Sequence, residues 1–379
     1  MLVSYEDVVN AYALIQNHII NTESYYSNVL SETLGCKIIV KYENKQHTGS
    51  FKVRGALNKL LSLSKEEKEN GIIAMSAGNH SQGVAYSAKI LGIKSTIVMP
   101  DNTPFDKIRK TSDLGADVII HGETLNDAEK YVDSLVKKSN FTKIHPFNDK
   151  FIIAGQGTMA LEFIKEHPDI DTLLVPVGGG GLIAGCSLIA KHLNNNIEVI
   201  GVETELFPSL YNVYNNTNYI CGGSTLAEGI AVSNIGKIPL SIIKKNVKEV
   251  LKVSENSIEE AVSIFLLKDK VVSEGAGAAG LAAILENKDK FKNRNVGIFL
   301  CGGNIDSRVL SSILMRDLVR KGQIITLSIA MADKPGQLGA ISKLCAEERV
   351  NILGVEHSRF ALDLSVSSAR LEITLETRN

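Results

Sequence analysis

Short apolar runs alternate with amphipathic stretches along most of the chain. The runs CKIIVKYE, GIIAMS, STIVMP and ADVIIHG are separated by stretches of helical periodicity, and the alternation returns in DTLLVPV, IEVIGVE and NVGIFLC. Continuous apolar runs of this length are typical of buried parallel strands that are joined by helices. The pattern therefore predicts an α/β fold in which right-handed crossovers place helices on both faces of parallel sheets.

The alternating pattern extends to about residue 320, which is more than one simple sheet needs, so we expect two parallel-sheet subdomains with a cleft between them. Ligands of open α/β sheets bind at the carboxyl ends of strands, and both SAGNH and VGGGG follow strands directly. After RDLVRKGQ the pattern changes to strand, turn, helix and two more strands. Residues 322–379 are therefore expected to form a small α+β module.

Composition excludes several classes of protein. The 379 residues carry a formal net charge of −1, which gives no reason to expect nucleic acid or an anionic membrane as a partner. The five cysteines are widely spaced and contain no C-x-x-C pair, so neither a disulfide framework nor a zinc site is expected. Free cysteines of this kind favour a cytoplasmic location. The N-terminal segment lacks the basic start and apolar core of a signal peptide, and no stretch is long and apolar enough to span a bilayer.

The stretch SFKVRGALNKL begins a predicted helix with a cation in its first turn. Thr48 and Ser50 are cap-type residues, and an apolar stripe follows. The positive end of a helix disfavours the charged form of Lys52, and so does burial, which would leave a nucleophilic amine. From this stretch alone, the commoner interpretation is that Lys52 is an ordinary lysine whose side chain points into water.

Three further motifs follow strands. The run from Gly178 to Gly181 could turn several backbone N–H groups onto one anion, or could be a tight turn where helix and strand pack closely; it matches neither the Walker A nor the dinucleotide pattern. Asn79 and His80 could bind a carboxylate, or could be a helix cap and an exposed histidine. Cys301 alone indicates only packing. Together with Lys52, these motifs specify a pocket for a phosphate-bearing aldehyde.

Five motifs occur in the order, and at roughly the spacing, of the threonine/serine dehydratases: SFKVRGA, SAGNHSQGVA, AGQGTMALE, VPVGGGGLIAG and GGNID. Over about residues 5–320 the chain resembles this family of pyridoxal-phosphate enzymes, which have the tryptophan synthase β fold. The resemblance implies pyridoxal 5′-phosphate as cofactor and a catalytic domain over residues 1–321. In that domain, a smaller subdomain of about residues 48–150 would be inserted in the larger one.

The resemblance also implies a role for each motif. Lys52 would carry the cofactor as a Schiff base, Phe51 would pack on the ring, and Cys301 would face the pyridine nitrogen with Glu274 nearby. The phosphate would be held by the N–H groups of Gly178, Gly179, Gly180, Gly181 and Leu182. Asn79 would bond the ring hydroxyl and belongs to the loop expected to bind the substrate carboxylate, which comprises Ser76, Ala77, Gly78, Asn79 and His80.

The implied reaction is β-elimination from L-threonine, and from L-serine, to a 2-oxoacid and ammonia, with Lys52 as carrier and general base. The alternatives are an L-serine dehydratase, a serine racemase or β-replacement synthase, and a non-catalytic amino-acid sensor. Ala77 disfavours the racemase, because serine racemases place a Ser there as acid and base. Glu203 resembles a cation ligand of the family, but the second expected acid falls near Ser209, so no metal is predicted.

The C-terminal module resembles an ACT regulatory domain, in which ADKPGQLGAI would be the effector-binding turn for an amino acid or a nucleotide. It lacks the second helix and fourth strand of that domain, which would leave IITLSIAM as an apolar edge. We therefore expect a truncated or naturally shortened module with a weak or absent effector response. The family resemblance further implies a homodimer or homotetramer.

Overall fold

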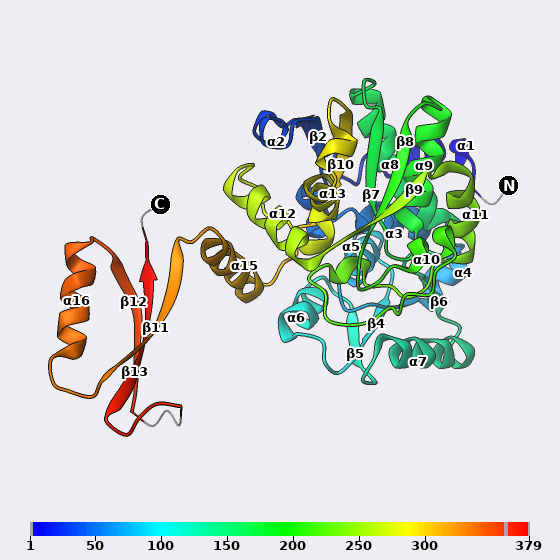
Figure 1. The fold of residues 1–379 in the computed structure, drawn as a ribbon. Coiled ribbons are helices and arrows are strands. Elements are labelled where there is room, and N and C mark those ends of the chain that lie inside the picture. Colours follow the sequence, from blue (N-terminus) through cyan, green and yellow to red (C-terminus); the bar gives the residue numbers. More distant parts are fainter. Residues whose placement is uncertain (1–2, 360–362, 378–379) are drawn as a thin grey trace. The chain divides into compact units, whose positions relative to one another are not determined.

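The computed structural model describes residues 3–359 and 363–377 and divides into two compact units, residues 1–305 and residues 306–379 (Figure 1). The division falls before α15 (Ser307–Arg320), whereas the predicted domain boundary falls after this helix. The outer ends of the predicted domains, residues 1–2 and 378–379, lie outside the described residues. No helix in the described part of the chain is long and apolar enough to cross a membrane.

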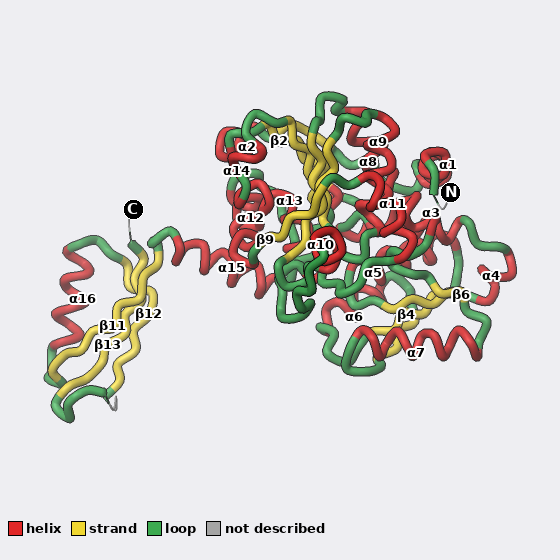
Figure 2. Tube along the Cα trace, turned by 45° about the vertical axis from the view of Figure 1, so that its right-hand side comes forward, coloured by secondary structure: helices red, strands yellow, loops and turns green. Residues whose placement is uncertain are grey.

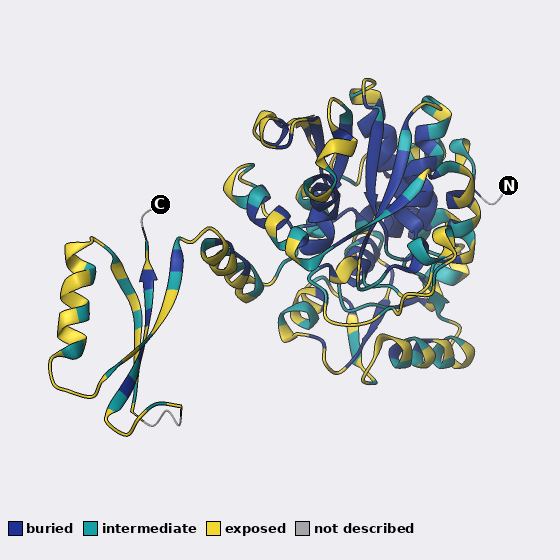
Figure 3. Cartoon of the chain, in the orientation of Figure 1, coloured by how far each residue is buried: buried dark blue, intermediate teal, exposed yellow. Residues whose placement is uncertain are grey.

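The first unit contains a six-stranded sheet with the order β1-β2-β10-β7-β8-β9, in which only β1 runs antiparallel to its neighbour. Its strands are β1 (Ser24–Tyr26), β2 (Lys37–Tyr42), β7 (Thr172–Pro176), β8 (Glu198–Thr204), β9 (Glu249–Val253) and β10 (Asn295–Leu300). Four of the predicted apolar runs form its central strands: CKIIVKYE contains β2, DTLLVPV contains β7, IEVIGVE contains β8 except its last residue and NVGIFLC contains β10. Figure 3 shows these central strands as buried, which explains why their sequences lack polar alternation.

Helices cover both faces of this sheet (Figure 2). On one face lie α1 (Tyr5–Ile15), α8 (Lys150–Glu166), α9 (Gly181–Leu193) and α11 (Lys237–Asn246). On the other lie α2 (Asn28–Leu34), α12 (Glu255–Leu267), α13 (Gly275–Glu286) and α14 (Lys288–Phe291), while α10 (Ser209–Asn215) follows β8. The first group and the sheet share one apolar core, in which α8 and α9 are buried along most of their length.

A second, four-stranded sheet with the order β5-β4-β3-β6 is formed by the chain between β2 and β7, and all its strands are parallel. Its strands are β3 (Ile72–Met75), β4 (Ser95–Met99), β5 (Asp117–Ile120) and β6 (Thr142–Lys143). Its helices are α3 (Lys52–Leu61), α4 (Lys65–Asn70), α5 (Asn79–Leu91), α6 (Phe105–Asp113) and α7 (Leu125–Lys138). Ile72 and Ala74 pack with α3 and α5, and Ile73 packs with α7, so alternate residues of β3 face opposite layers.

The second unit contains α15, β11 (Ile324–Ala332), α16 (Gln337–Glu347), β12 (Asn351–Ser358) and β13 (Ser368–Glu376). The strands form an antiparallel sheet with the order β11-β13-β12. The predicted succession of strand, turn, helix and two strands is therefore present. The segment IITLSIAM lies in β11, which is an edge strand of this sheet.

A buried network of ion pairs anchors α3 to its surroundings. The guanidinium of Arg54 lies 2.8 Å from a carboxylate oxygen of Glu43 and 2.8 Å from one of Glu162. Lys41 Nζ lies 2.9 Å from the other oxygen of Glu162. All four side chains are at most 5% exposed, and two cations balance two anions. Removal of one cation would leave a buried carboxylate without its partner.

We expect Arg54→Leu to lower the free energy of unfolding by about 3–5 kcal/mol, because Glu43 and Glu162 would lose their shared partner. Urea denaturation followed by circular dichroism measures this loss. The matched control is Lys65→Ala, which removes the exposed Lys65–Glu69 pair on α4 and should change stability by less than about 1 kcal/mol. Equal effects of the two substitutions would contradict this account of the network.

Candidate active site

The predicted site residues lie at the carboxyl ends of strands from both sheets of the first unit. β3 leads into the loop before α5, β7 leads into the glycine run before α9, and β10 leads into Cys301. The connection after β2 carries α3 and Lys52. The N–H of Phe51 donates to the carbonyl of Cys301 at 3.1 Å, and Ser50 forms a β-bridge with Gly302. These contacts place the start of α3 beside the end of β10.

Lys52 is the first residue of α3 and so lies in the first turn, as predicted, but the predicted caps are wrong. Phe51 occupies the cap position, and no side chain caps the helix. The hydroxyls of Thr48 and Ser50 are buried and have no hydrogen-bond partner among the described residues. Ser50 cannot cap α3 because its backbone bridges to β10, and Thr48 is in the left-handed region with φ 62°.

Lys52 is partly buried at the start of α3. Burial lowers its pKa, while the acidic groups of Cys301 and Glu274 oppose that shift. Lys52 Nζ lies 5.0 Å from the centre of the Phe51 ring. α5 packs so closely on this turn that a Cβ at Gly83 would lie 3.1 Å from the carbonyl carbon of Lys52. The result is an amine with an increased neutral fraction, held on a packed helix start.

The glycine run forms a turn that admits no side chains. A Cβ at Gly179 would lie 2.2 Å from the ring of Phe147, and one at Gly181 would lie 2.9 Å from Cβ of Phe147. Gly180 caps α9 with a positive φ of 89°. No protein acceptor within the described residues is bonded to the N–H groups of Gly178 through Leu182. Five such donors at the positive end of a helix form a site for an anion.

A side-chain network joins the two sheets at the other side of the site. Asn79 Nδ2 donates to Glu274 Oε1 at 2.7 Å, and Asn304 Nδ2 donates to Asn79 Oδ1 at 2.7 Å and to the carbonyl of Thr48 at 2.7 Å. Burial raises the pKa of Glu274 to about 7, although the Asn79 hydrogen bond opposes this shift. Glu274 therefore contacts Asn79, and its charge acts on the pKa values of both Lys52 and Cys301.

The loop from Ser76 to Asn79 is partly exposed at the start of α5, and Ser76 Oγ accepts the N–H of Gly78 at 3.2 Å. The imidazole of His80 instead points into the protein, where its Nε2 lies 3.2 Å from the carbonyl oxygen of Ile144. Burial lowers the pKa of His80 to about 3, so the ring is neutral. If His80 binds the predicted carboxylate, it therefore does so through its backbone N–H and not through its imidazole.

Cys301 is buried at the end of β10, and its Sγ donates to the carbonyl of Phe299 at 3.5 Å. Burial raises the pKa of this thiol well above its ordinary value, so Cys301 is neutral. Its predicted position opposite a pyridine nitrogen stays a prediction. All five cysteines of the chain are free.

Three contributors were not assigned from the sequence. Phe147 packs on the glycine run, and Asn304 orients Asn79. Lys107 of α6 forms an ion pair with Glu228, and its charge opposes the rise in the pKa of Glu274. Asn304 belongs to the quoted motif GGNID, which could have indicated it. Phe147 and Lys107 reach the site only through tertiary contacts, and no local pattern distinguishes them from other aromatic and basic residues.

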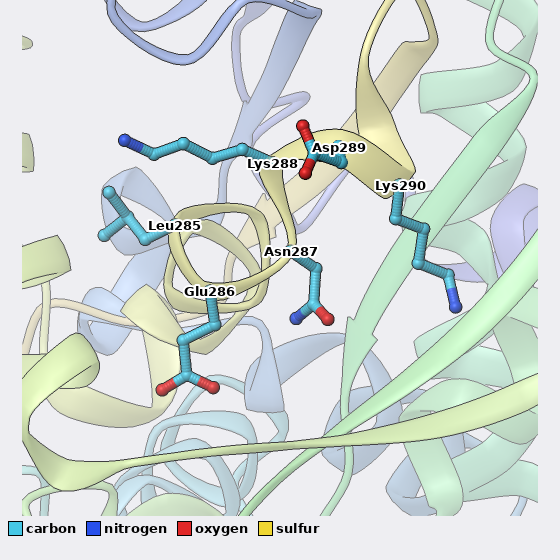
Figure 4. Close-up of a pocket in the computed structure, with 6 residues that line it drawn as sticks. All are labelled: Leu285, Glu286, Asn287, Lys288, Asp289 and Lys290. Carbon is cyan, nitrogen blue, oxygen red and sulfur yellow. The ribbon is translucent and has the colours of Figure 1, made fainter.

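Two other polar features serve the fold. Glu203 accepts the hydroxyl of Ser209 and the N–H groups of Leu210 and Tyr211 at 2.8–3.0 Å, so its carboxylate caps α10. A surface pocket is lined by residues 285–290 (Figure 4). In this pocket, Glu286 Oε1 accepts hydrogen bonds from Ser254 and Ser257 at the start of α12. This oxygen therefore already has partners within the protein.

Comparison with known proteins decides the family. The family model described as pyridoxal-phosphate dependent enzyme matches residues 15–302. The chain belongs to this family. It is 43% identical over 378 residues to the L-threonine ammonia-lyase of Thermotoga maritima. The matched region covers 99% of this chain and 94% of that protein. The expected family and cofactor are thereby confirmed.

Solved structures of this family share the fold. The processed threonine deaminase isoform 2 from Solanum lycopersicum matches with a TM-score of 0.78 and 32% identity, covering 82% of this chain and 87% of that one. The serine racemase from Dictyostelium discoideum matches with a TM-score of 0.75 and 35% identity, covering 81% of this chain and 100% of that one. The expectation of two parallel-sheet subdomains of the pyridoxal-phosphate fold is confirmed.

The site fits pyridoxal phosphate. The glycine run offers unpartnered N–H donors where a side chain would clash, which suits a phosphate. Lys52 offers an amine with a lowered pKa, which suits attachment of an aldehyde. Cys301 offers a buried neutral thiol at the end of β10, which suits an unprotonated ring nitrogen. The phosphate, the aldehyde and the ring nitrogen therefore each have a candidate partner in this site.

Glu274 should make stability depend on pH. Its pKa is about 7 in the folded chain against 4.5 for an ordinary glutamate. The buried carboxyl is uncharged in both states below about pH 4.5 and then costs no stability, whereas above about pH 7 the folded chain bears the full cost of burying its charge. Glu274→Gln keeps an acceptor for Asn79 and removes this titration. Relative to the parent, we expect the variant to gain about 2 kcal/mol between about pH 5 and pH 8.

Urea denaturation of both proteins at each pH, with the cofactor removed, measures this difference. The parent and Glu69→Gln, which changes an exposed residue of α4, should show the same pH dependence. If Glu274→Gln also follows the parent at every pH, the raised pKa of Glu274 is wrong.

Proposed function

We propose that this protein is a threonine ammonia-lyase, which converts L-threonine to 2-oxobutanoate and ammonia and also accepts L-serine. The observation that carries this proposal is the amine of Lys52, whose pKa is lowered and which lies at a helix start in a site that also holds the glycine cradle and Asn79. The relative of 43% identity that bears this name supports the choice of reaction.

Pyridoxal phosphate supplies the electron sink that allows an amino acid to lose its α-proton and then its β-substituent. Lys52 would hold the cofactor through its Nζ. Once the substrate amine has replaced it there, the freed Nζ would take the proton from Cα of the substrate, since a lowered pKa increases the neutral fraction of this amine. The N–H groups of residues 178–182 hold the phosphate. The N–H groups at residues 76–80 hold the substrate carboxylate beside the start of α5.

Ala77 separates this proposal from a racemase. A racemase needs a second acid on the face of the substrate opposite Lys52, and the methyl group of Ala77 cannot donate a proton. The likeness to a serine racemase therefore supports the shared fold and cofactor, while Ala77 supports elimination. Formation of D-serine from L-serine would favour the racemase instead.

We also propose that residues 1–321 act as a catalytic domain and residues 322–379 as a regulatory domain, in a homodimer or homotetramer. The turn at Asp333–Gly336 precedes α16 as an effector-binding turn would, and an amino acid or nucleotide is the proposed effector class. The five free cysteines support a location in the reducing cytoplasm.

Lys52→Ala tests the proposed function directly. The parent should show an absorption band near about 410–420 nm from the lysine-bound cofactor and release 2-oxobutanoate from L-threonine. The variant should lose the band and at least about 1000-fold in kcat. Lys89→Ala, which changes an exposed lysine of α5, is the control and should match the parent. A parent that has the band but releases no 2-oxobutanoate would contradict the proposed reaction.

Cys301 tests how the site treats the pyridine nitrogen. Cys301→Ser keeps a small neutral group and should retain most activity. Cys301→Asp would place a carboxylate there, hold the ring nitrogen protonated and reduce elimination by about tenfold or more. Steady-state kinetics with L-threonine measure both effects. Equal rates in the parent and both variants would mean that Cys301 does not contact the ring.

A further inference from the structure

The turn at residues 145–149 joins β6 of the four-stranded sheet to α8 and lies against the glycine run. The ring and Cβ of Phe147 occupy the space that side chains at Gly179 and Gly181 would need. This aromatic residue therefore forms part of the wall of the proposed phosphate cradle.

The same turn reaches the cradle by a second route. Asn148 Oδ1 accepts the N–H of Ile238 at 3.0 Å, near the start of α11. The N–H of Gly236, which caps that helix, donates to the carbonyl of Gly179 at 3.1 Å. The position of Asn148 is thus transmitted to the glycine run through α11.

His145 holds both residues in place. Its Nδ1 accepts the N–H of Phe147 at 3.2 Å and the N–H of Asn148 at 2.9 Å. Its ring stands edge-on to the Phe147 ring, with centroids 4.7 Å apart and an interplanar angle of 85°. A ring nitrogen can accept these bonds only while it carries no proton.

The surroundings keep the imidazole of His145 neutral. Burial lowers its pKa, and Lys143 of β6 acts in the same direction, whereas nearby carboxylates act against it. Those carboxylates are Glu129, Asp133 and Asp149. Lys143 Nζ also pairs with Glu129 and Asp133 at 3.0 and 2.6 Å, which reduces their pull on the ring.

We propose that His145 is a positioning residue for the cofactor phosphate: by accepting two backbone N–H groups on Nδ1, it holds Phe147 and Asn148 against the glycine run. The proposal rests on the assignment of the glycine run as the phosphate site. It gives His145 no contact with the substrate, and it predicts an effect on cofactor affinity rather than on the chemical step.

The far end of the turn is anchored independently of His145. Asp149 Oδ1 accepts the N–H groups of Phe151 and Ile152 at 2.7 and 3.2 Å and caps α8. Its other oxygen lies 2.9 Å from Lys59 Nζ of α3. Substitution of His145 should therefore loosen the turn and leave α8 in place.

The test compares His145→Ala with His145→Asn. An asparagine Oδ1 lies near the position of the histidine Nδ1 and can accept both N–H groups, whereas alanine accepts neither. Titration of pyridoxal phosphate into cofactor-free protein, followed by the visible band, should give a Kd about tenfold higher for His145→Ala than for the parent. His145→Asn should remain within about threefold of the parent.

Pyridoxal, which has the aldehyde but no phosphate, is the matched probe. It should bind the parent and both variants equally, because the proposed defect lies in the phosphate site. An unchanged Kd for pyridoxal phosphate in His145→Ala would overturn the proposal. So would a loss in His145→Asn as large as in His145→Ala, or an equal loss for pyridoxal.

A variant that does not fold is replaced by a second one. If circular dichroism shows that His145→Ala is unfolded, His145→Gln takes its place, because its amide reaches the Nε2 position and should weaken binding likewise. A parent without any visible band would instead contradict the cofactor assignment, and a parent with the band but no turnover would contradict the proposed reaction. Failure of either is thereby distinguished from failure of the role of His145.

Discussion

Lys52 lies partly buried at the positive end of α3, and this placement determines what the site can do. Burial and the helix dipole both disfavour an ammonium ion there. Such a placement is costly, so the helix start has to be held by strong contacts. The Arg54 network buried in the same helix, the bridge between Ser50 and Gly302, and the close packing of Gly83 provide those contacts.

The site depends on both sheets of the first unit. The glycine run and Cys301 follow strands of the six-stranded sheet, and Asn79 follows a strand of the four-stranded sheet. Hydrogen bonds from Asn79 to Glu274, and from Asn304 to Asn79, cross between them. Groups on one sheet are therefore oriented by groups on the other, so the two sheets have to be correctly positioned for either half of the site to be complete.

Most of the polar groups of the site are neutral or close to neutrality. Cys301 stays a thiol, His80 stays an imidazole, and Glu274 titrates near neutral pH. The proposed anion sites are instead the backbone N–H groups at the starts of α9 and α5. Fixed dipoles of this kind bind a phosphate or a carboxylate without burying a permanent cation, whose desolvation would be expensive.

The sequence by itself determined the alternation of strands and helices, the position of Lys52 at a helix start and the glycine run, because these features depend on local periodicity and on residues that lack a side chain. Tertiary structure alone decided that Ser50 bridges to β10 instead of capping α3, that the imidazole of His80 turns inward, and that Phe147 and Asn304 complete the site. These outcomes depend on contacts between segments about 30 to 250 residues apart, whose geometry is set by how the two sheets pack and not by any local pattern.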